Sequence, residues 1–233
     1  MRSAMHRIAG IDGCKSGWIV VEADSDLNQA ELRFASNWHD VNSTARIVAV
    51  DMPIGLSRNG VRQCEVEARK LLSPCASRIF KTFSRGALRF SADDWIAANQ
   101  WSKGRGFGGI SKQAWNIGPK IREIDREIRP KDQARIIEAH PELAFARLNR
   151  GRPLDSKHAP AGLQARQAIL RRAGFTNLDG WLQSLRGKGA KADDLFDACA
   201  LVLTARNILR GEGKFLPAIE ERDSRGLKMA IAY

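Results

Sequence analysis

Carboxylates stand at the ends of two short apolar runs in the first quarter of the chain. Ile8–Ile11 leads into Asp12, and Ile47–Val50 leads into Asp51. A run of this kind is typical of a strand buried on both faces of a sheet. Open α/β sheets bind their ligands at the carboxyl ends of such strands. Two acids brought to one edge therefore indicate a metal site, although either Asp alone is equally well interpreted as the cap of a turn.

A late helical pattern supplies further acids. Asp194 and Asp197 are three residues apart near the start of the helix expected over 193–206, so they share one helical face. Mg²⁺ and Mn²⁺ take oxygen ligands, and a two-metal phosphoryl-transfer site needs carboxylates from separate elements. Glu138, at the end of another expected strand, is the first choice for a third acid. The predicted metal ligands are Asp12, Asp51, Asp194 and Asp197, and the predicted catalytic residues are these four with Glu138.

Other ionisable residues have competing interpretations. Glu67 is the second choice for the third acid, but it is also explained as a solvated helix residue that pairs with a neighbouring base. Glu142 is better interpreted as an acid in the first turn of a helix. His140 can bind a metal or move a proton, but a single His before Pro141 is more often a structural cap. The glycines at 104–109 lack the GK[ST] ending of a phosphate-binding loop.

The elements that must position these acids follow from the hydrophobic periodicity. Three strands joined by short turns predict an antiparallel meander, and a short helix and a fourth strand follow. The expected strands are 8–12, 17–23, 29–35, 46–51 and 134–139, with an edge strand in 226–233. The expected helices are 37–45, 61–72, 91–101, 111–129 with a boundary or kink at Pro119, 141–149, 161–172, 178–185 and 193–206.

The bulk properties bound the class of protein. The chain has 233 residues, 43% of them hydrophobic and 27% charged, which is an ordinary globular balance. It has no apolar run long enough to span a bilayer and no signal-peptide core, so we expect a cytoplasmic protein without membrane partners. The four Cys have no CxxC spacing, which favours reduced thiols over a zinc site or a disulfide framework.

A net charge of +12 predicts a polyanionic partner, because neutralised phosphates release counterions. The alternative is a basic protein from a proteome of high pI. Many of the basic residues fall in a segment of about 56–130, which has the pattern of a helical insertion. There Phe80, Phe83, Trp101 and Trp115 could stack bases, although core packing explains Trp115 better. The predicted substrate-binding residues are Arg78, Lys81, Arg85, Lys112 and Lys120.

The order of elements and acids resembles the ribonuclease H-like fold, and the chain more closely resembles the family named domain of unknown function 429. The matching motifs include Gly10-Ile-Asp12-Gly, Val50-Asp51-Met-Pro, Glu138-Ala-His140-Pro and Asp193-Asp-Leu-Phe-Asp197-Ala. The resemblance implies an α/β fold with a mixed five-stranded sheet flanked by helices. It implies one domain over 1–233 with an insertion after the fourth strand, and an active edge carrying Asp12, Asp51, Glu138, Asp194 and Asp197.

These observations predict a nuclease that uses Mg²⁺ or Mn²⁺ to hydrolyse phosphodiester bonds of DNA or RNA. A binding protein for nucleic acid or another partner, built on the same fold without catalysis, is the main alternative. A small-molecule phosphotransferase is less favoured. Sugar kinases and actin-like ATPases share this core but need two copies of it, and 233 residues leave room for one. The sequence predicts neither the oligomeric state nor any preference of the enzyme for DNA or RNA.

Overall fold

The structure is a computed structural model that describes residues 6–233. The chain divides into two compact units. One unit comprises the chain up to Met52 together with Arg135–Lys214 and Ala232–Tyr233, and the other comprises Pro53–Ala134 and Phe215–Ile231. The insertion expected over 56–130 falls within the second unit, which also takes in the segment Phe215–Ile231.

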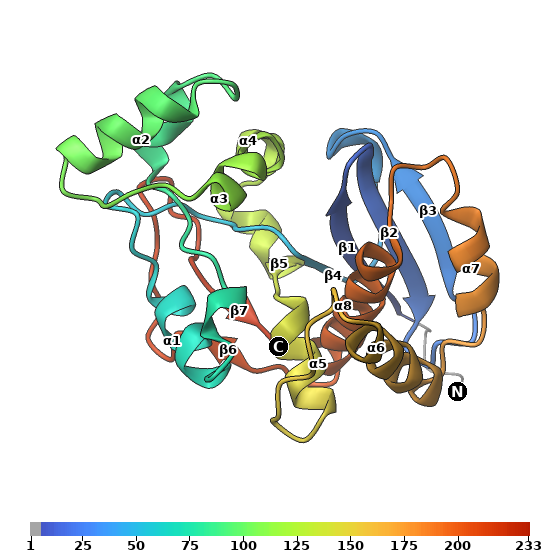
Figure 1. Cartoon of the computed structure of the whole chain (residues 1–233). Helices are drawn as coiled ribbons and strands as arrows, with labels where there is room; N and C mark the ends of the chain where they lie inside the picture. The colour runs from blue at the N-terminus through green and yellow to red at the C-terminus, as the bar shows by residue number, and fades with distance from the viewer. Residues whose placement is uncertain (1–5) are drawn as a thin grey trace. The chain divides into compact units, whose positions relative to one another are not determined.

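A mixed five-stranded sheet forms the centre of the first unit (Figure 1). Its strands are β1 (Arg7–Cys14), β2 (Gly17–Asp24), β3 (Glu31–Ala35), β4 (Ile47–Val50) and β5 (Ile136–Glu138). They are arranged in the order β3-β2-β1-β4-β5. Strand β2 is antiparallel to both of its neighbours, β1 and β3, whereas β4 and β5 are parallel to β1. The predicted sheet is therefore confirmed, and its parallel half is the half that ends in Asp12 and Asp51.

The short helix expected over 37–45 is present only as a 3-10 helix of three residues, His39–Val41. The side chain of Asn37 accepts a hydrogen bond from the backbone N–H of Asp40, and Asn42 adopts a left-handed conformation with φ of 33°. A left-handed residue ends a helix, so the chain turns directly into β4.

One face of the sheet is covered by α8 (Ala192–Leu209), which packs on β1, β2 and β4. The side chains of Ile8, Ile19, Val21, Ile47 and Ala49 belong to the same buried cluster as residues along α8. Gly10 permits this packing, because a Cβ at that position would collide with the backbone of α8 at Ala198 and Val202. A glycine in β1 thus sets how closely α8 approaches the sheet.

Three further helices complete the first unit: α5 (Pro141–Leu148), α6 (Pro160–Ala173) and α7 (Leu178–Ser184). Helices α5 and α6 both contact α8 (Figure 1). Phe145 of α5 and Leu170 of α6 are fully buried in the cluster around α8. The sheet and these helices therefore share one hydrophobic core, and the described carboxylates of interest lie at its rim.

The second unit is largely helical. It contains α1 (Gln63–Leu71), α2 (Trp95–Gly104), α3 (Lys112–Asn116), α4 (Gly118–Glu127) and the short strand β6 (Phe215–Leu216). The single helix expected over 111–129 is divided into α3 and α4, and Pro119 lies in the first turn of α4, where its missing N–H costs nothing. The tail forms β7 (Ile231–Ala232), which pairs with β6 in a two-stranded sheet. One parallel bridge joins Ala232 to Ala139 beyond β5.

Candidate metal centre

Strand alternation directs the carboxylates of Asp12 and Asp51 to the face that carries α8. Ile8 and Gly10 of β1 point towards α8, so Asp12, two residues further on, shares their face. Ile47 and Ala49 of β4 establish the same face for Asp51. Ile11 pairs with Val50, and the N–H of Asp51 donates to the carbonyl of Ile11, so the two acids follow matched positions on adjacent strands.

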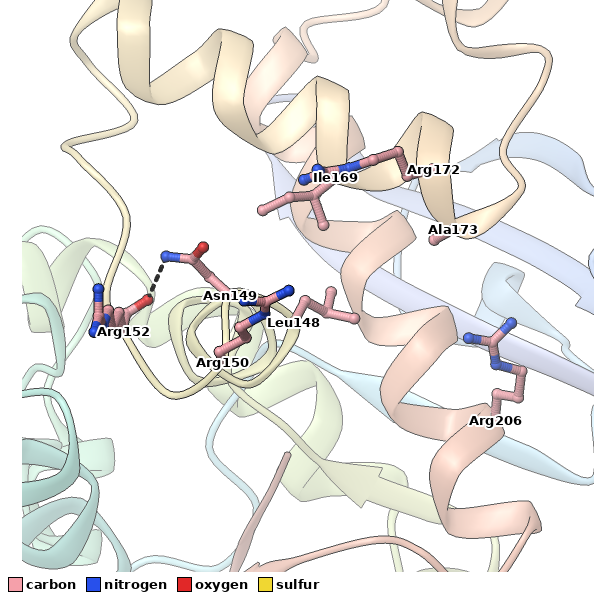
Figure 2. A pocket seen from close by; sticks show the side chains of 8 residues that line it. All are labelled: Leu148, Asn149, Arg150, Arg152, Ile169, Arg172, Ala173 and Arg206. Atoms are coloured by element: carbon pink, nitrogen blue, oxygen red, sulfur yellow. Dashed lines mark hydrogen bonds between the residues drawn. The ribbon is translucent and has the colours of Figure 1, made fainter.

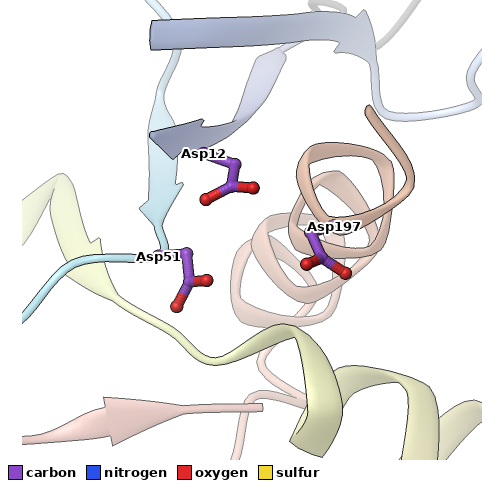
Figure 3. Close-up of side chains that lie close together, drawn as sticks. All are labelled: Asp12, Asp51 and Asp197. Carbon is purple, nitrogen blue, oxygen red and sulfur yellow. The ribbon is translucent and has the colours of Figure 1, made fainter. Parts of the chain in front are cut away.

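The third member of the group is Asp197, in the first half of α8. Ligand oxygens of Asp12, Asp51 and Asp197 all lie within 4.8 Å of one another (Figure 3). Asp197 immediately precedes Ala198, whose carbonyl is the backbone atom closest to Gly10. The close contact of helix and strand at Gly10 therefore also brings Asp197 to Asp12.

Burial raises the pKa of each of these acids, and repulsion within the group raises it further at Asp12 and Asp51. The pKa of Asp12 lies well above its usual range because of burial and then because of Asp51 and Asp197. Burial, followed by repulsion from Asp197, raises the pKa of Asp51 to about 8. Burial also raises the pKa of Asp197 to about 6, although Lys157 lowers it. Three acids this close, of which Asp12 and Asp197 are buried and Asp51 is partly buried, are costly to ionise together unless a cation joins them.

Lys157 supplies positive charge to this group. Its Nζ donates to Oδ2 of Asp197 at 2.6 Å and lies 3.4 Å from Oδ2 of Asp193. Burial alone would lower the pKa of Lys157, but Asp197, Asp12 and Asp51 together raise it above its usual value. The lysine therefore remains protonated. With all three clustered acids ionised, Lys157 offsets one of their charges, and a single divalent ion would neutralise the other two.

The donors fit a hard divalent cation. Oδ1 of Asp197 is buried and has no hydrogen-bond partner among the described residues, while Asp197 as a whole is 2% exposed. A buried carboxylate oxygen without a donor is expensive, and a metal ion is one way to satisfy it. Oδ1 of Asp12 accepts a hydrogen bond of 2.7 Å from the N–H of Gly13, which fixes the orientation of that carboxylate. All three residues offer oxygen, the ligand atom that Mg²⁺ and Mn²⁺ prefer.

Comparison with known proteins places the chain in a family. The model of a family described as "Protein of unknown function (DUF429)" matches residues 10–222. The chain belongs to the DUF429 family. No curated protein and no solved structure gives a significant match. The match begins at Gly10 and includes Asp12, Asp51, Lys157 and Asp197, so the whole carboxylate group of this DUF429 chain lies inside it.

Two other predicted acids take different positions. Asp194 accepts a hydrogen bond from the N–H of Lys191 at 2.8 Å and so caps α8, and its carboxylate is not in the group of three. Glu138 pairs with Val50, and strand alternation sends it to the face opposite Ile137 and Ala139. It is buried and near enough to contribute to the raised pKa of Asp51, but its oxygens lie outside the group of three.

The remaining polar candidates of the first unit have structural partners. His140 caps α5, because its Nδ1 accepts from the N–H of Glu142 at 3.2 Å. Glu142 lies in the first turn of α5, as predicted, and forms an ion pair with Arg166, a fully buried arginine of α6. Glu67, the other acid considered for the site, lies on α1 in the second unit.

All five predicted substrate-binding residues lie in the second unit. Arg85 forms ion pairs with Asp125 at 2.8 Å and with Asp223, so it is part of the internal structure of that unit. Lys81 Nζ donates to the carbonyl of Phe107, and Lys112 lies 5.1 Å from the ring centroid of Trp95. Arg78 and Lys120 are partly exposed.

The aromatic residues considered for base stacking differ in how far they are buried. Trp115 is 5% exposed and Phe83 is 4% exposed, and their ring centroids lie 5.4 Å apart, so both belong to the core of the second unit. Trp101 is enclosed by Phe90, Phe107 and the guanidinium of Arg89. Of the four, Phe80 is the exposed ring.

Lys157 is the site residue that the sequence did not reveal. It lies between α5 and α6, in a segment predicted only as a loop, and no periodicity or motif marks it. Its role depends on how that loop returns to the start of α8, which is a tertiary relationship. Among residues 6–233, none of the helices has the length and apolar character that crossing a membrane requires.

Proposed function

We propose that this DUF429 chain is a divalent-metal-dependent nuclease with a ribonuclease H-like fold. The observation that carries the proposal is the convergence of Asp12, Asp51 and Asp197 from two strand ends and one helix. The strand order β3-β2-β1-β4-β5, with a meander followed by two parallel strands, supports the fold assignment. A helix bearing an acid across the ends of β1 and β4 is the arrangement that the resemblance implies.

The chain's own residues have defined tasks in this proposal. Asp12, Asp51 and Asp197 would hold Mg²⁺ or Mn²⁺, which when bound activates water and neutralises charge on the scissile phosphate. The backbone N–H of Gly13 keeps Asp12 oriented. Lys157 reaches the group from a separate loop, and its ammonium can donate to a phosphate oxygen once the cation shares Asp197.

Nucleic acid is the proposed substrate because of the charge of the protein. A net charge of +12 attracts a phosphate backbone and concentrates it near the protein surface. The three carboxylates themselves repel phosphate, so binding at the site depends on the cation and on Lys157. Affinity for DNA or RNA should therefore fall steeply as salt is raised.

A non-catalytic role on the same fold is the second candidate, and Lys157 is the observation that favours it. An ammonium 2.6 Å from Asp197 already satisfies part of the charge that a metal would neutralise. In that case the acids and the lysine would form a structural ion-pair cluster, and the protein would bind nucleic acid without cleaving it.

The test is cleavage of labelled single- and double-stranded DNA and RNA with Mn²⁺ and with EDTA. We compare wild type with Asp12→Asn and with Asp93→Asn, a matched control at an exposed acid of the second unit. Because Asp12 is a direct ligand in the proposal, its variant should lose at least about 100-fold in rate, while the control keeps wild-type activity. Equal cleavage by Asp12→Asn and wild type would contradict the proposal. Binding without cleavage in any condition would favour the second candidate.

A further inference from the structure

A polar cavity lies within the first unit, and none of the three clustered carboxylates lines it. It has a volume of about 690 Å³, within the range of small-molecule sites. Its walls come from the end of α5 and the following turn, from α6 and from the last part of α8 (Figure 2). Its charged lining residues are Arg150, Arg152, Arg172 and Arg206.

The cavity is distinct from the candidate metal centre. Arg206 and Asp197 lie on the same helix, α8, nine residues apart. Nine residues correspond to about two and a half turns and a rise of about 13 Å, so the two side chains leave opposite sides of the helix. A ligand of this cavity therefore does not depend on the metal centre.

The four guanidinium groups are unpaired. Within residues 6–233, none of the four forms an ion pair or donates a side-chain hydrogen bond to a protein acceptor, and Nε of Arg206 is buried. The neighbouring Arg147 behaves differently, because it donates to the carbonyls of Tyr233 and Glu212. Among the described residues, the arginines of the cavity therefore make no hydrogen bonds of the kind that Arg147 makes.

The four arginines place positive charge around the cavity (Figure 2). Burial and the adjacent Arg210 lower the pKa of Arg206, partly offset by Glu212 and Asp26. An anion in the cavity would offset this positive charge and accept charge-assisted hydrogen bonds, and guanidinium matches phosphate oxygens in a bidentate manner.

The apolar part of the lining favours a phosphate ester over inorganic phosphate as the ligand. Leu148 and Ile169 line the same cavity, and both belong to or pack against the hydrophobic core. Inorganic phosphate would leave this wall in contact with water, whereas an organic body attached to the phosphate would cover it. We propose that the cavity between α5, α6 and α8 is a binding site for a small phosphate ester, held by Arg150, Arg152, Arg172 and Arg206.

The experiment is calorimetric titration of the full chain with AMP and with inorganic phosphate, in EDTA and at low salt. The chelator keeps metal from the carboxylates, so a failure here leaves the nuclease proposal untouched. We expect AMP to bind more tightly than phosphate. The double variant Arg172→Gln/Arg206→Gln should bind AMP at least about tenfold more weakly, because each charge-assisted hydrogen bond contributes about one order of magnitude.

Arg171→Gln is the matched control. Arg171 is the neighbour of Arg172 on α6, but it pairs with Asp179 on the surface rather than lining the cavity. This variant removes the same charge and should keep wild-type affinity. The single variant Arg172→Gln, at an exposed position, serves if the double variant does not fold.

Three results would overturn the proposal. They are no binding of AMP, equal affinity for AMP and inorganic phosphate, or AMP affinity that falls equally in Arg171→Gln and Arg172→Gln. Binding of a single-stranded oligonucleotide with the same arginine dependence, in the absence of AMP binding, would also overturn it and identify the cavity as part of a nucleic-acid surface.

Discussion

Nζ of Lys157 donates to Oδ2 of Asp197 at 2.6 Å and so brings an ammonium to the edge of three clustered carboxylates. Asp197 is nearly fully buried, whereas the side chain of Lys157 remains 30% exposed. The lysine can therefore withdraw towards solvent when a cation enters, while Asp197 is held in place by α8. This pairing links the stability of the metal-free protein to the occupancy of the site.

Removal of Lys157 should destabilise the metal-free protein. We expect Lys157→Met to lower the free energy of unfolding in EDTA by about 1–3 kcal/mol, because the buried carboxylate of Asp197 loses the ammonium that donates to it. Addition of Mn²⁺ should raise the melting temperature of the variant more than that of wild type, since the ion replaces the missing charge. Thermal unfolding with EDTA and with Mn²⁺ measures both effects. Lys131→Met, at an exposed lysine, is the control, and an unchanged melting temperature for Lys157→Met in EDTA would argue against the pairing.

Loss of the proton from Asp51 should lower the free energy of unfolding as the pH rises. Burial raises its folded pKa from 3.8 to about 8, so between these values the folded protein holds a proton that the unfolded chain has lost. Stability contributed by the protonated form is present at low pH and disappears as the pH rises through the folded pKa. In EDTA, Asp51→Asn should therefore unfold at a higher temperature than wild type, with a larger gain near pH 8 than near pH 5. A gain that does not change with pH would contradict the assigned cause.

The same substitution should abolish the response to metal. Mn²⁺ is expected to stabilise wild type by binding only the folded state, and Asp51→Asn should lose most of that increase in melting temperature. A site whose acid costs stability when empty and contributes it when filled is characteristic of function rather than packing. Equal stabilisation of both proteins by Mn²⁺ would place the ion elsewhere.

Gly10 should be intolerant of substitution although it lies far from any turn. A methyl group at this position meets the carbonyl of Ala198 and the N–H of Val202, and neither backbone atom can rotate away. We expect Gly10→Ala to lower the free energy of unfolding by at least about 2 kcal/mol. Where the variant folds, displacement of α8 should also weaken Mn²⁺ binding through Asp197. Chemical denaturation and metal titration measure the two effects.

The control for Gly10 is a glycine with space around it. Gly180 in α7 has no heavy atom within 4 Å of an added Cβ, so Gly180→Ala should change stability by less than about 1 kcal/mol. If Gly10→Ala were equally mild, the close approach of β1 and α8 would not be what positions Asp197.

The sequence predicts the three carboxylates of the candidate centre but not Lys157, for identifiable reasons. Asp12 and Asp51 can be predicted because each comes at the end of a buried apolar run, which places it at the edge of the sheet. Asp197 can be predicted because helical spacing determines which residues share a face. Lys157, Arg150 and Arg152 lie outside the helices, where the path of the chain depends on tertiary contacts rather than local pattern, and Arg172 and Arg206 lie on predicted helices whose packing around the cavity is also tertiary. The same limit applies to Phe215–Ile231, whose place in the second unit depends on contacts with residues far away in the sequence.

Asp194 and Glu138 have a strong local pattern, but they lie outside the group of three carboxylates. Asp194 fits the helical face of Asp197, but its carboxylate is taken up by the N–H of Lys191 as a cap. Glu138 ends a strand as expected, but it is in register with Val50, so it lies on the face opposite the one that carries Asp51. Spacing along an element thus predicts which residues are neighbours, while hydrogen bonding and register decide which of them reach the site.

The most direct measurement is anomalous diffraction from crystals of wild type and Asp12→Asn soaked in Mn²⁺. We predict a manganese peak in wild type that is ligated by Asp12, Asp51 and Asp197, with Nζ of Lys157 moved away from Asp197, and no such peak in the variant. Crystals in which the ion is absent from this group, or is bound equally well in Asp12→Asn, would contradict the assignment of these carboxylates as a metal centre.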